Sequence, residues 1–158
     1  MNKNILYTSI LFSFVLISFI SCDSDQPKKV IEHYDNGYVK AEYYLKNGKK
    51  EGTFKRYSSD KENLLISEYN FINNIQEGKA VFYFPNSKIQ EVQYYENGKR
   101  QKSDTVFYES GAIEMITDYK DDKKHGYTRK YNEDGKLFFE ALWENDKFIK
   151  INESLIKK

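Results

Sequence analysis

Hydrophobic and polar positions alternate in short runs along residues 30–148, and turn-forming residues separate these runs. Five turn residues are each followed eleven positions later by a second turn residue, pairing Gly37, Asn63, Ser87, Gly111 and Gly135 with Gly48, Asn74, Gly98, Asp122 and Asp146. The pattern recurs every 24 residues, and one unit has 26. Short runs bounded by Asn-Gly and Asp-Gly predict β-hairpins, and the repetition predicts that the hairpins stack.

Three columns of apolar residues recur within the predicted strands. The first is Val39, Leu65, Ile89, Ile113 and Leu137, the second is Leu45, Phe71, Tyr95, Tyr119 and Trp143, and the third is Tyr57, Tyr83, Phe107 and Tyr131. Because six residues, an even number, separate the first two columns, we expect both on one face of the sheet. A three-residue loop that ends in a left-handed glycine would add the third column to that face, whereas a two-residue loop would place it opposite. The Asn-Gly and Asp-Gly endings favour the three-residue loop.

The opposite face is predicted to differ between repeats. It mixes charged and apolar residues in the first, second and fifth repeats, but is mainly apolar in the third and fourth. The apolar members are Phe82, Phe84, Val92, Tyr94, Val106, Tyr108 and Ile116. Exposed apolar patches usually mark interaction surfaces, so we expect these residues to bind a partner or a second copy. The alternative is that sheet twist or residues 147–158 cover them.

Segments such as Tyr34-Asp35-Asn36-Gly37 and Tyr94-Tyr95-Glu96-Asn97-Gly98-Lys99 resemble the bacterial variant of the membrane-occupation-and-recognition-nexus (MORN) repeat. The resemblance covers about residues 30–148, as five repeats, and implies an all-β fold: an elongated single antiparallel sheet of stacked hairpins. Some members of this family are antitoxins of toxin–antitoxin pairs. Ser87 and Lys102 stand where the repeat has glycine, which predicts distorted turns. Residues 149–158 are expected to form a C-terminal cap, as a strand or a short helix.

Residues 1–21 are predicted to be a signal peptide with a helical apolar segment and no part in the fold. Its 16-residue uncharged run, Ile5–Ile20, would span about 24 Å as a helix, short of a ~30 Å bilayer core. Phe19-Ile20-Ser21-Cys22 resembles the lipobox of bacterial lipoproteins, although leucine is commonest at the position of Phe19. The resemblance implies cleavage after Ser21 and lipidation of Cys22, with 22–29 as lipidated cysteine and tether. An uncleaved transmembrane anchor is the alternative.

The expected location is the bacterial cell envelope, with attachment to the membrane through the lipid. Acidic residues soon after the cysteine, here Asp23 and Asp25, resemble a surface-export signal of Bacteroidetes-type lipoproteins. Asp directly after the cysteine also resembles an inner-membrane retention signal of enteric bacteria. The outer membrane or cell surface is favoured, and the periplasmic face of the inner membrane stays open.

Charge and composition exclude several functions. The chain has 158 residues, with 25 Lys and Arg against 24 Asp and Glu, and Lys3 is the only charged residue of the signal peptide. A balanced mature chain lacks the surplus of cations on which nucleic-acid affinity depends. One Cys excludes an internal disulfide and a Cys-rich zinc site. His33 and His125 are the only imidazoles, and no nucleophile, zinc or phosphate-loop motif is present, so we expect no enzyme, cofactor or metal site.

The sequence therefore predicts a lipid-anchored envelope protein whose repeat sheet is a non-catalytic protein-interaction module. Two alternatives remain: a glycan-binding surface lipoprotein that stacks Tyr and Trp rings on sugars, and an antitoxin or immunity-type lipoprotein.

Overall fold

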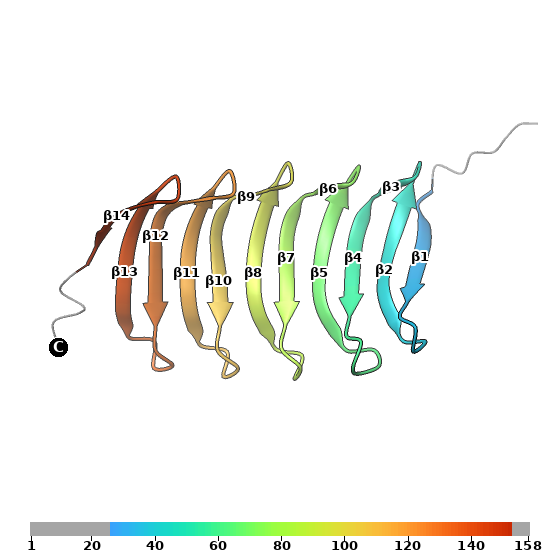
Figure 1. Ribbon diagram of the computed structural model, residues 1–158, viewed down its shortest axis with the longest axis horizontal. Helices are drawn as coiled ribbons and strands as arrows, with labels where there is room; N and C mark the ends of the chain where they lie inside the picture. The colour runs from blue at the N-terminus through green and yellow to red at the C-terminus, as the bar shows by residue number, and fades with distance from the viewer. Residues whose placement is uncertain (1–25, 153–158) are drawn as a thin grey trace, which may run out of the picture.

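A computed structural model describes residues 26–152, which form one open antiparallel sheet (Figure 1). The signal peptide, Cys22 and the first part of the tether, and residues 153–158, lie outside the described residues. The strands are β1 (Lys28–His33), β2 (Val39–Lys46), β3 (Lys49–Lys50), β4 (Gly52–Tyr57), β5 (Leu65–Ile72), β6 (Ile75–Gln76), β7 (Gly78–Tyr83), β8 (Ile89–Glu96), β9 (Lys99–Arg100), β10 (Lys102–Phe107), β11 (Ile113–Lys120), β12 (Lys123–Tyr131), β13 (Leu137–Glu144) and β14 (Lys147–Ile151).

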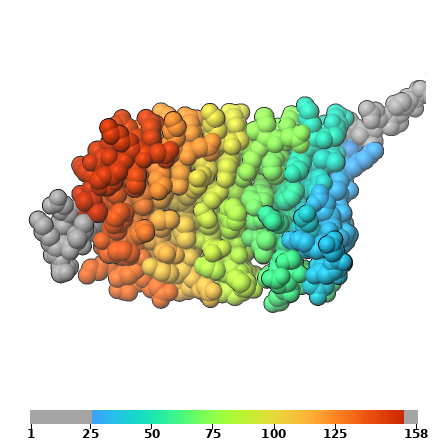
Figure 2. All heavy atoms as spheres, in the orientation of Figure 1, coloured from blue at the N-terminus to red at the C-terminus, as the bar shows by residue number. Residues whose placement is uncertain are grey.

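The strands lie in chain order along an elongated ribbon (Figure 1). The main path is β1-β2-β4-β5-β7-β8-β10-β11-β12-β13-β14, and the two-residue strands β3, β6 and β9 pair with β2, β5 and β8. The space-filling view shows the successive hairpins as bands across a slab (Figure 2). The predicted all-β, single antiparallel sheet is therefore confirmed, with no helix in residues 26–152.

One end of each hairpin is closed by a short loop, which has three residues in four hairpins and five in the β4–β5 hairpin, where the Ser58 N–H donates to the carbonyl of Leu64 at 2.9 Å. In the last of them, the Gly135 N–H donates to the carbonyl of Asn132 at 2.9 Å, and Gly135 has a φ of 78°. Tyr131 consequently pairs with Leu137, and the other members of the third column pair with the aliphatic column in the same way. The shared face of these two columns is confirmed, and the expected three-residue loop is confirmed in all hairpins but β4–β5.

The other end of each hairpin is a two-residue turn in which both residues have positive φ, as type I′ turns require. These turns are Asn47-Gly48, Asn73-Asn74, Asn97-Gly98, Asp121-Asp122 and Asn145-Asp146. Asn, Asp and Gly tolerate the left-handed conformation best, which explains why they occupy these positions. Four residues after the second turn residue, Gly52, Gly78 and Gly126 also have positive φ.

Ser87 and Lys102 adopt the left-handed conformation of the glycines that they replace. Their φ angles are 66° and 64°, and the Ser87 N–H donates to the carbonyl of Phe84 at 2.8 Å, as glycine does in the equivalent loops. The predicted distortion of these turns was wrong, because the surrounding pairing imposes the backbone conformation and the side chains bear the steric cost.

Lys102→Gly is therefore expected to raise the free energy of unfolding. A left-handed non-glycine residue costs about 1–2 kcal/mol, and glycine loses about 0.5–1 kcal/mol more chain entropy, which leaves a net gain of about 0.5–1 kcal/mol. The ion pair of Lys102 with Glu96 is exposed, so its loss subtracts little. Urea unfolding measures the change, and Lys99→Gly, in an extended strand, should instead lower stability. Equal effects of the two substitutions would contradict this explanation.

A β-bulge near the start of the second long strand of every hairpin separates the first two columns. Glu32 pairs with Ala41 and His33 with Val39, so Lys40 is an extra residue on β2. The same shift occurs in the other hairpins, at Ile66, Gln90, Glu114 and Phe138. The expectation that the first two columns share a face was wrong, because the extra residue reverses the alternation between them.

The two faces are named here by these columns. Face A carries Leu45, Phe71, Tyr95, Tyr119 and Trp143, and face B carries Val39, Leu65, Ile89, Ile113 and Leu137.

A single layer leaves little room for a core. Among the described residues the buried hydrophobic side chains are Ala41, Ala80, Val92 and Ala141, and no large side chain is fully buried. Rings on face A supply part of the packing: Tyr43 stacks on Phe54 at 5.3 Å, and Tyr69 meets Phe82 edge-on at 5.7 Å between centroids. Stability therefore accumulates from hairpin to hairpin rather than from one central core.

Hydrogen bonds from each two-residue turn join consecutive hairpins. The Lys50 N–H donates to the Asn74 side chain at 2.6 Å, and the Asn74 N–H donates back to the Lys50 carbonyl at 3.0 Å. Arg100 with Asp122, and Lys124 with Asp146, repeat this reciprocal pair, whereas Gly98 donates to the Gln76 carbonyl without a side chain to return the bond. These bonds fix the backbone at positions 50, 100 and 124.

The last strand, β14, pairs with β13, with Trp143 opposite Phe148. Residues 149–151 of the expected cap thus belong to a strand. The rest of the expected cap lies outside the described residues.

Candidate functional site

One row of side chains crosses face B and changes character along the sheet. Successive cross-strand pairs place in it Ile31, Glu42, Lys55, Glu68, Val81, Val92, Thr105, Ile116, Arg129 and Glu140. From β2 to β5 the row is charged, and Lys55 lies 3.9 Å from Glu68. After β11 it is charged again, and the Arg129 Nε donates to Glu140 at 2.8 Å. The four members between these ion pairs carry no charge.

A second row widens this uncharged segment. Tyr83 pairs with Ile89, and Phe107 pairs with Ile113, on the face of Val81 and Thr105 because side chains alternate along β7 and β10. The resulting apolar patch comprises Val81, Tyr83, Ile89, Val92, Phe107, Ile113 and Ile116. Ile89 and Ile113 are 40% and 39% exposed. A contiguous apolar surface of this kind marks an interaction site more often than scattered apolar residues do.

A hollow of about 430 Å³ adjoins the apolar patch at the beginning of β11. Ile113, Ile116 and Tyr131 line it, together with the acidic residues Glu133 and Asp134. The hollow is thus suited to an apolar side chain that has a positive charge beside it.

The structure divides the seven residues of the predicted patch between two faces. Phe82 and Val106 both pair with Glu91 and lie on face A. Val92, Tyr94 and Ile116 lie on face B, and the loop residue Tyr108 donates its O–H to the carbonyl of Tyr131 at 2.8 Å. Phe84 likewise lies in a loop, after β7. The expectation of a single patch was wrong, because the bulge shifts residues of β8 and β11 to the other face.

The patch that the structure does form lies in the third and fourth hairpins, as the sequence predicted. Four of its members, Tyr83, Ile89, Phe107 and Ile113, were interpreted in the sequence only as structural columns. The repeat pattern alone did not show that these four residues belong to an exposed apolar surface. Val39 and Leu65 occupy the same column in the first two hairpins, where their neighbours are charged.

Face A carries a row in which cations and rings alternate. Lys50, Gln76, Arg100 and Lys124 each pair across the sheet with a member of the second column. The Lys124 Nζ lies 4.7 Å from the centroid of Trp143, the Arg100 guanidinium 4.2 Å from that of Tyr119, and the Lys50 Nζ 5.3 Å from that of Phe71. We name these four residues the cation ladder. Sequence reasoning missed it, although the four positions follow the period of the repeat.

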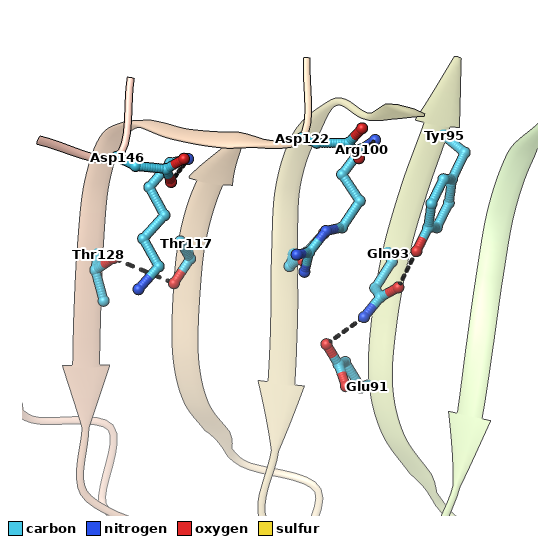
Figure 3. A network of polar contacts seen from close by, with 10 residues as sticks. Glu91, Gln93, Tyr95, Arg100, Thr117, Asp122, Thr128 and Asp146 are labelled. Atoms are coloured by element: carbon cyan, nitrogen blue, oxygen red, sulfur yellow. Dashed lines mark hydrogen bonds and ion pairs between the residues drawn. The ribbon is translucent and has the colours of Figure 1, made fainter. Parts of the chain in front are cut away.

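A network of polar side chains lies below the ladder on face A (Figure 3). Gln93 accepts a hydrogen bond from the Tyr95 O–H at 2.7 Å and donates to Glu91 at 2.7 Å. The Thr117 and Thr128 hydroxyls lie 3.3 Å apart. Burial raises the pKa of Tyr95, so this phenol stays protonated and continues to donate. These hydrogen-bonded polar side chains occupy the middle of face A in place of apolar ones.

Asp104 is a buried member of this network whose hydrogen bonding is incomplete. It is 4% exposed, its Oδ2 accepts from Arg100 at 3.2 Å, and its Oδ1 has no hydrogen-bond partner among the described residues. Burial raises the pKa of the Asp104 carboxyl to about 6, against the opposing effect of Arg100, and the nearby Glu91 adds to the increase.

The raised pKa predicts a pH-dependent stability. Between pH 4 and 6 folded Asp104 holds its proton while the unfolded side chain has lost it, so this contribution is full at low pH and is lost as pH rises through about 6. The loss is on the order of 3 kcal/mol. Asp104→Asn should therefore gain stability relative to wild type between pH 4 and pH 7 in urea unfolding. Asp60→Asn, in an exposed loop, is the control. If the difference in free energy of unfolding between Asp104→Asn and wild type does not change with pH, the raised pKa of Asp104 is contradicted.

Two further findings bear on chemistry. Residues 26–152 contain no cluster of three or more His, Cys, Asp or Glu side chains that could hold a metal ion. His125 lines a hollow of about 320 Å³ with Leu142, Trp143 and Ile149, and His33 ends the edge strand β1.

The predicted cleavage and lipidation residues, Ser21 and Cys22, lie outside the described residues. Within the part of the chain that the structure covers, no helix is long and apolar enough to span a membrane.

The geometry defines the class of fold: an open, single-layer antiparallel sheet of repeated hairpins, with an apolar patch on one face and a cation ladder on the other. Comparison with protein-family models gives no match, and a search of curated proteins finds no similar sequence.

Proposed function

We propose that this protein is a lipid-anchored protein of the bacterial cell envelope whose face B binds another protein, without catalysis. The observation that carries the proposal is the apolar patch between two ion-paired flanks. Ile89 and Ile113 stay about 40% exposed, and no second layer covers them within residues 26–152. Burying one such side chain contributes about 1.5–3 kcal/mol, so a few of them are enough for a specific contact.

The surroundings of the patch indicate the chemistry of the partner. The hollow beside Ile113 and Ile116 is also lined by two acidic residues, Glu133 and Asp134. A partner that places an apolar side chain in this hollow and a Lys or Arg beside it would be complementary in shape and charge. The ion pairs on either side of the patch are already satisfied, so they define its limits rather than attract a ligand.

The proposal includes the assignment of residues 30–148 to five MORN-type repeats. The support is geometric: all five hairpins share the same bulge and the same two-residue turn, and four of them share the three-residue loop, which is two residues longer in the β4–β5 hairpin. Equivalent backbone geometry at equivalent sequence positions is what a tandem repeat predicts.

The anchor is supported by the sequence. Cys22 is the single cysteine of the chain and follows Ser21 at the end of the uncharged run. Thioether and amide-linked acyl chains, palmitate among them, would together hold the protein stably, since more than one chain is needed for stable attachment. The outer membrane or cell surface is the proposed location, with the sheet held off the membrane by the tether.

Cys22→Ala is expected to abolish lipid incorporation. Cells grown with an alkyne analogue of palmitate should label the wild-type protein and leave the variant unlabelled, because no other thiol can take the lipid. Ser21→Ala keeps a small residue before the cysteine and serves as the control that should label normally. Labelling of the Cys22→Ala variant, or an unlabelled wild-type protein, would contradict the anchor.

A further inference from the structure

The cation ladder has a spacing that the sheet itself fixes. Each ladder position lies two residues after a two-residue turn. Between one position and the next lies a strand that carries a residue of the second column. Since neighbouring strands lie ~4.8 Å apart, successive positions are about 10 Å apart. The reciprocal hydrogen bonds to Asn74, Asp122 and Asp146 hold the backbone at the three cations. The ladder is thus a preorganised array of charges at a regular interval.

Two of the three cations are available for a ligand. Lys50 and Lys124 make no ion pair with the described residues, and each is half-buried with its Nζ against aromatic rings. Lys50 lies 4.8 Å from the centroid of Phe54, and Lys124 lies 4.7 Å from that of Trp143. Arg100 is engaged by Asp104. Partial removal from water makes the attraction of these ammonium groups for an anion stronger than at a fully exposed lysine.

The rings between the cations supply a second kind of contact. Phe71, Tyr95, Tyr119 and Trp143 are all half-buried, so part of each ring faces solvent on face A. Aromatic rings offer apolar area at low entropic cost, and the C–H faces of sugar rings pack well on such surfaces. A ligand that matches this surface has flat apolar units and a negative charge every 10 Å or so.

We propose that face A binds an extended acidic polysaccharide that carries one carboxylate per disaccharide. In such a chain two sugar units span about the width of one hairpin, so carboxylates meet Lys50 and Lys124, while Arg100 stays paired with Asp104 and the sugars lie against the intervening rings. Gln76 stands where a fourth cation would complete the register. This site is on the face opposite the apolar patch and does not depend on the proposed protein partner.

The chain offers matched controls for this proposal. Lys49 and Lys123 precede Lys50 and Lys124 in the same short strand segments, and alternation places them on face B. Lys50→Gln with Lys124→Gln, and Lys49→Gln with Lys123→Gln, therefore change the net charge equally. Full-length protein in detergent is titrated with hyaluronan oligosaccharides, which carry one carboxylate per disaccharide, at low and moderate salt.

The expected result is that the face A pair weakens hyaluronan binding about tenfold, from two half-exposed ion pairs, while the face B pair stays within about twofold of wild type. Binding should also weaken with added salt. Equal losses from both pairs would overturn the proposal, because the attraction would then follow net charge alone.

A gain of affinity provides a test that misfolding cannot imitate. Gln76→Lys should strengthen hyaluronan binding about threefold by adding the missing cation, and Ile75→Lys, the adjacent residue on face B, should not. The proposal is overturned if wild type does not bind hyaluronan, if neutral chitin oligosaccharides bind equally well, or if anionic lipid vesicles displace the oligosaccharide from the ladder.

Discussion

A variant with Ile89→Asp and Ile113→Asp is expected to bind the partner of face B about a hundredfold more weakly than wild type. Each substitution places a carboxylate in the centre of a desolvated contact, and central apolar anchors typically contribute 2 kcal/mol or more. Both side chains are about 40% exposed in the free protein, so the sheet itself should keep its stability. Titration of the purified partner against both proteins gives the ratio of dissociation constants.

The chain supplies a control with the same chemistry. Ile72 and Ile75 flank the turn after β5, are 48% and 47% exposed, and lie on face B but outside the apolar patch. Ile72→Asp with Ile75→Asp adds the same charge and removes the same kind of surface, and it should leave partner affinity unchanged within about twofold. Equal losses in the two double variants would show that the patch has no special role.

Gly126→Ala is expected to cause the largest loss of stability among single substitutions. A Cβ at Gly126 would lie 2.8 Å from both the Cβ and Oδ2 of Asp118, and the φ of 114° is strained for any other residue. Asp118 cannot move away freely, because it accepts hydrogen bonds from Ser103 and from the Tyr127 N–H. We expect a loss of about 3 kcal/mol or more in urea unfolding.

Gly52→Ala is the matched control for Gly126→Ala. Gly52 occupies the equivalent position of the second hairpin, with a φ of 76° and no atom within 4 Å of an added Cβ. Its substitution should cost only about 1–2 kcal/mol, the price of the left-handed conformation. Losses of equal size at the two glycines would contradict the role assigned to Asp118.

The general architecture could be predicted because turn chemistry repeats along the chain. Glycine, asparagine and aspartate at fixed intervals determine where the strands end, and the Gly135 type of loop determines which residues face one another. The bulge could not be predicted in this way. The extra residues, among them Lys40, Gln90 and Phe138, share no side-chain type, because the shift arises from backbone pairing.

That one-residue shift decided which surface residues were identified correctly. Residues that precede the bulge lie on the face predicted for them relative to the aliphatic column. Val92 and Ile116, which follow the bulge, were predicted on the face opposite that column but lie on the same face as it. The cation ladder was hidden for a different reason. In a chain with 31% charged residues, Lys50 and Lys124 do not stand out until cross-strand pairing places them among rings.

Site-specific photo-crosslinking tests whether face B is the protein-binding surface in the cell. A photoreactive residue replaces either Ile113, in the apolar patch, or Lys130, which is exposed on face A of the neighbouring strand. The account predicts a discrete adduct with one protein from position 113 that disappears when Ile89→Asp is added, and no such adduct from position 130. Absence of an adduct at position 113, or the same adduct from both faces, would contradict the account.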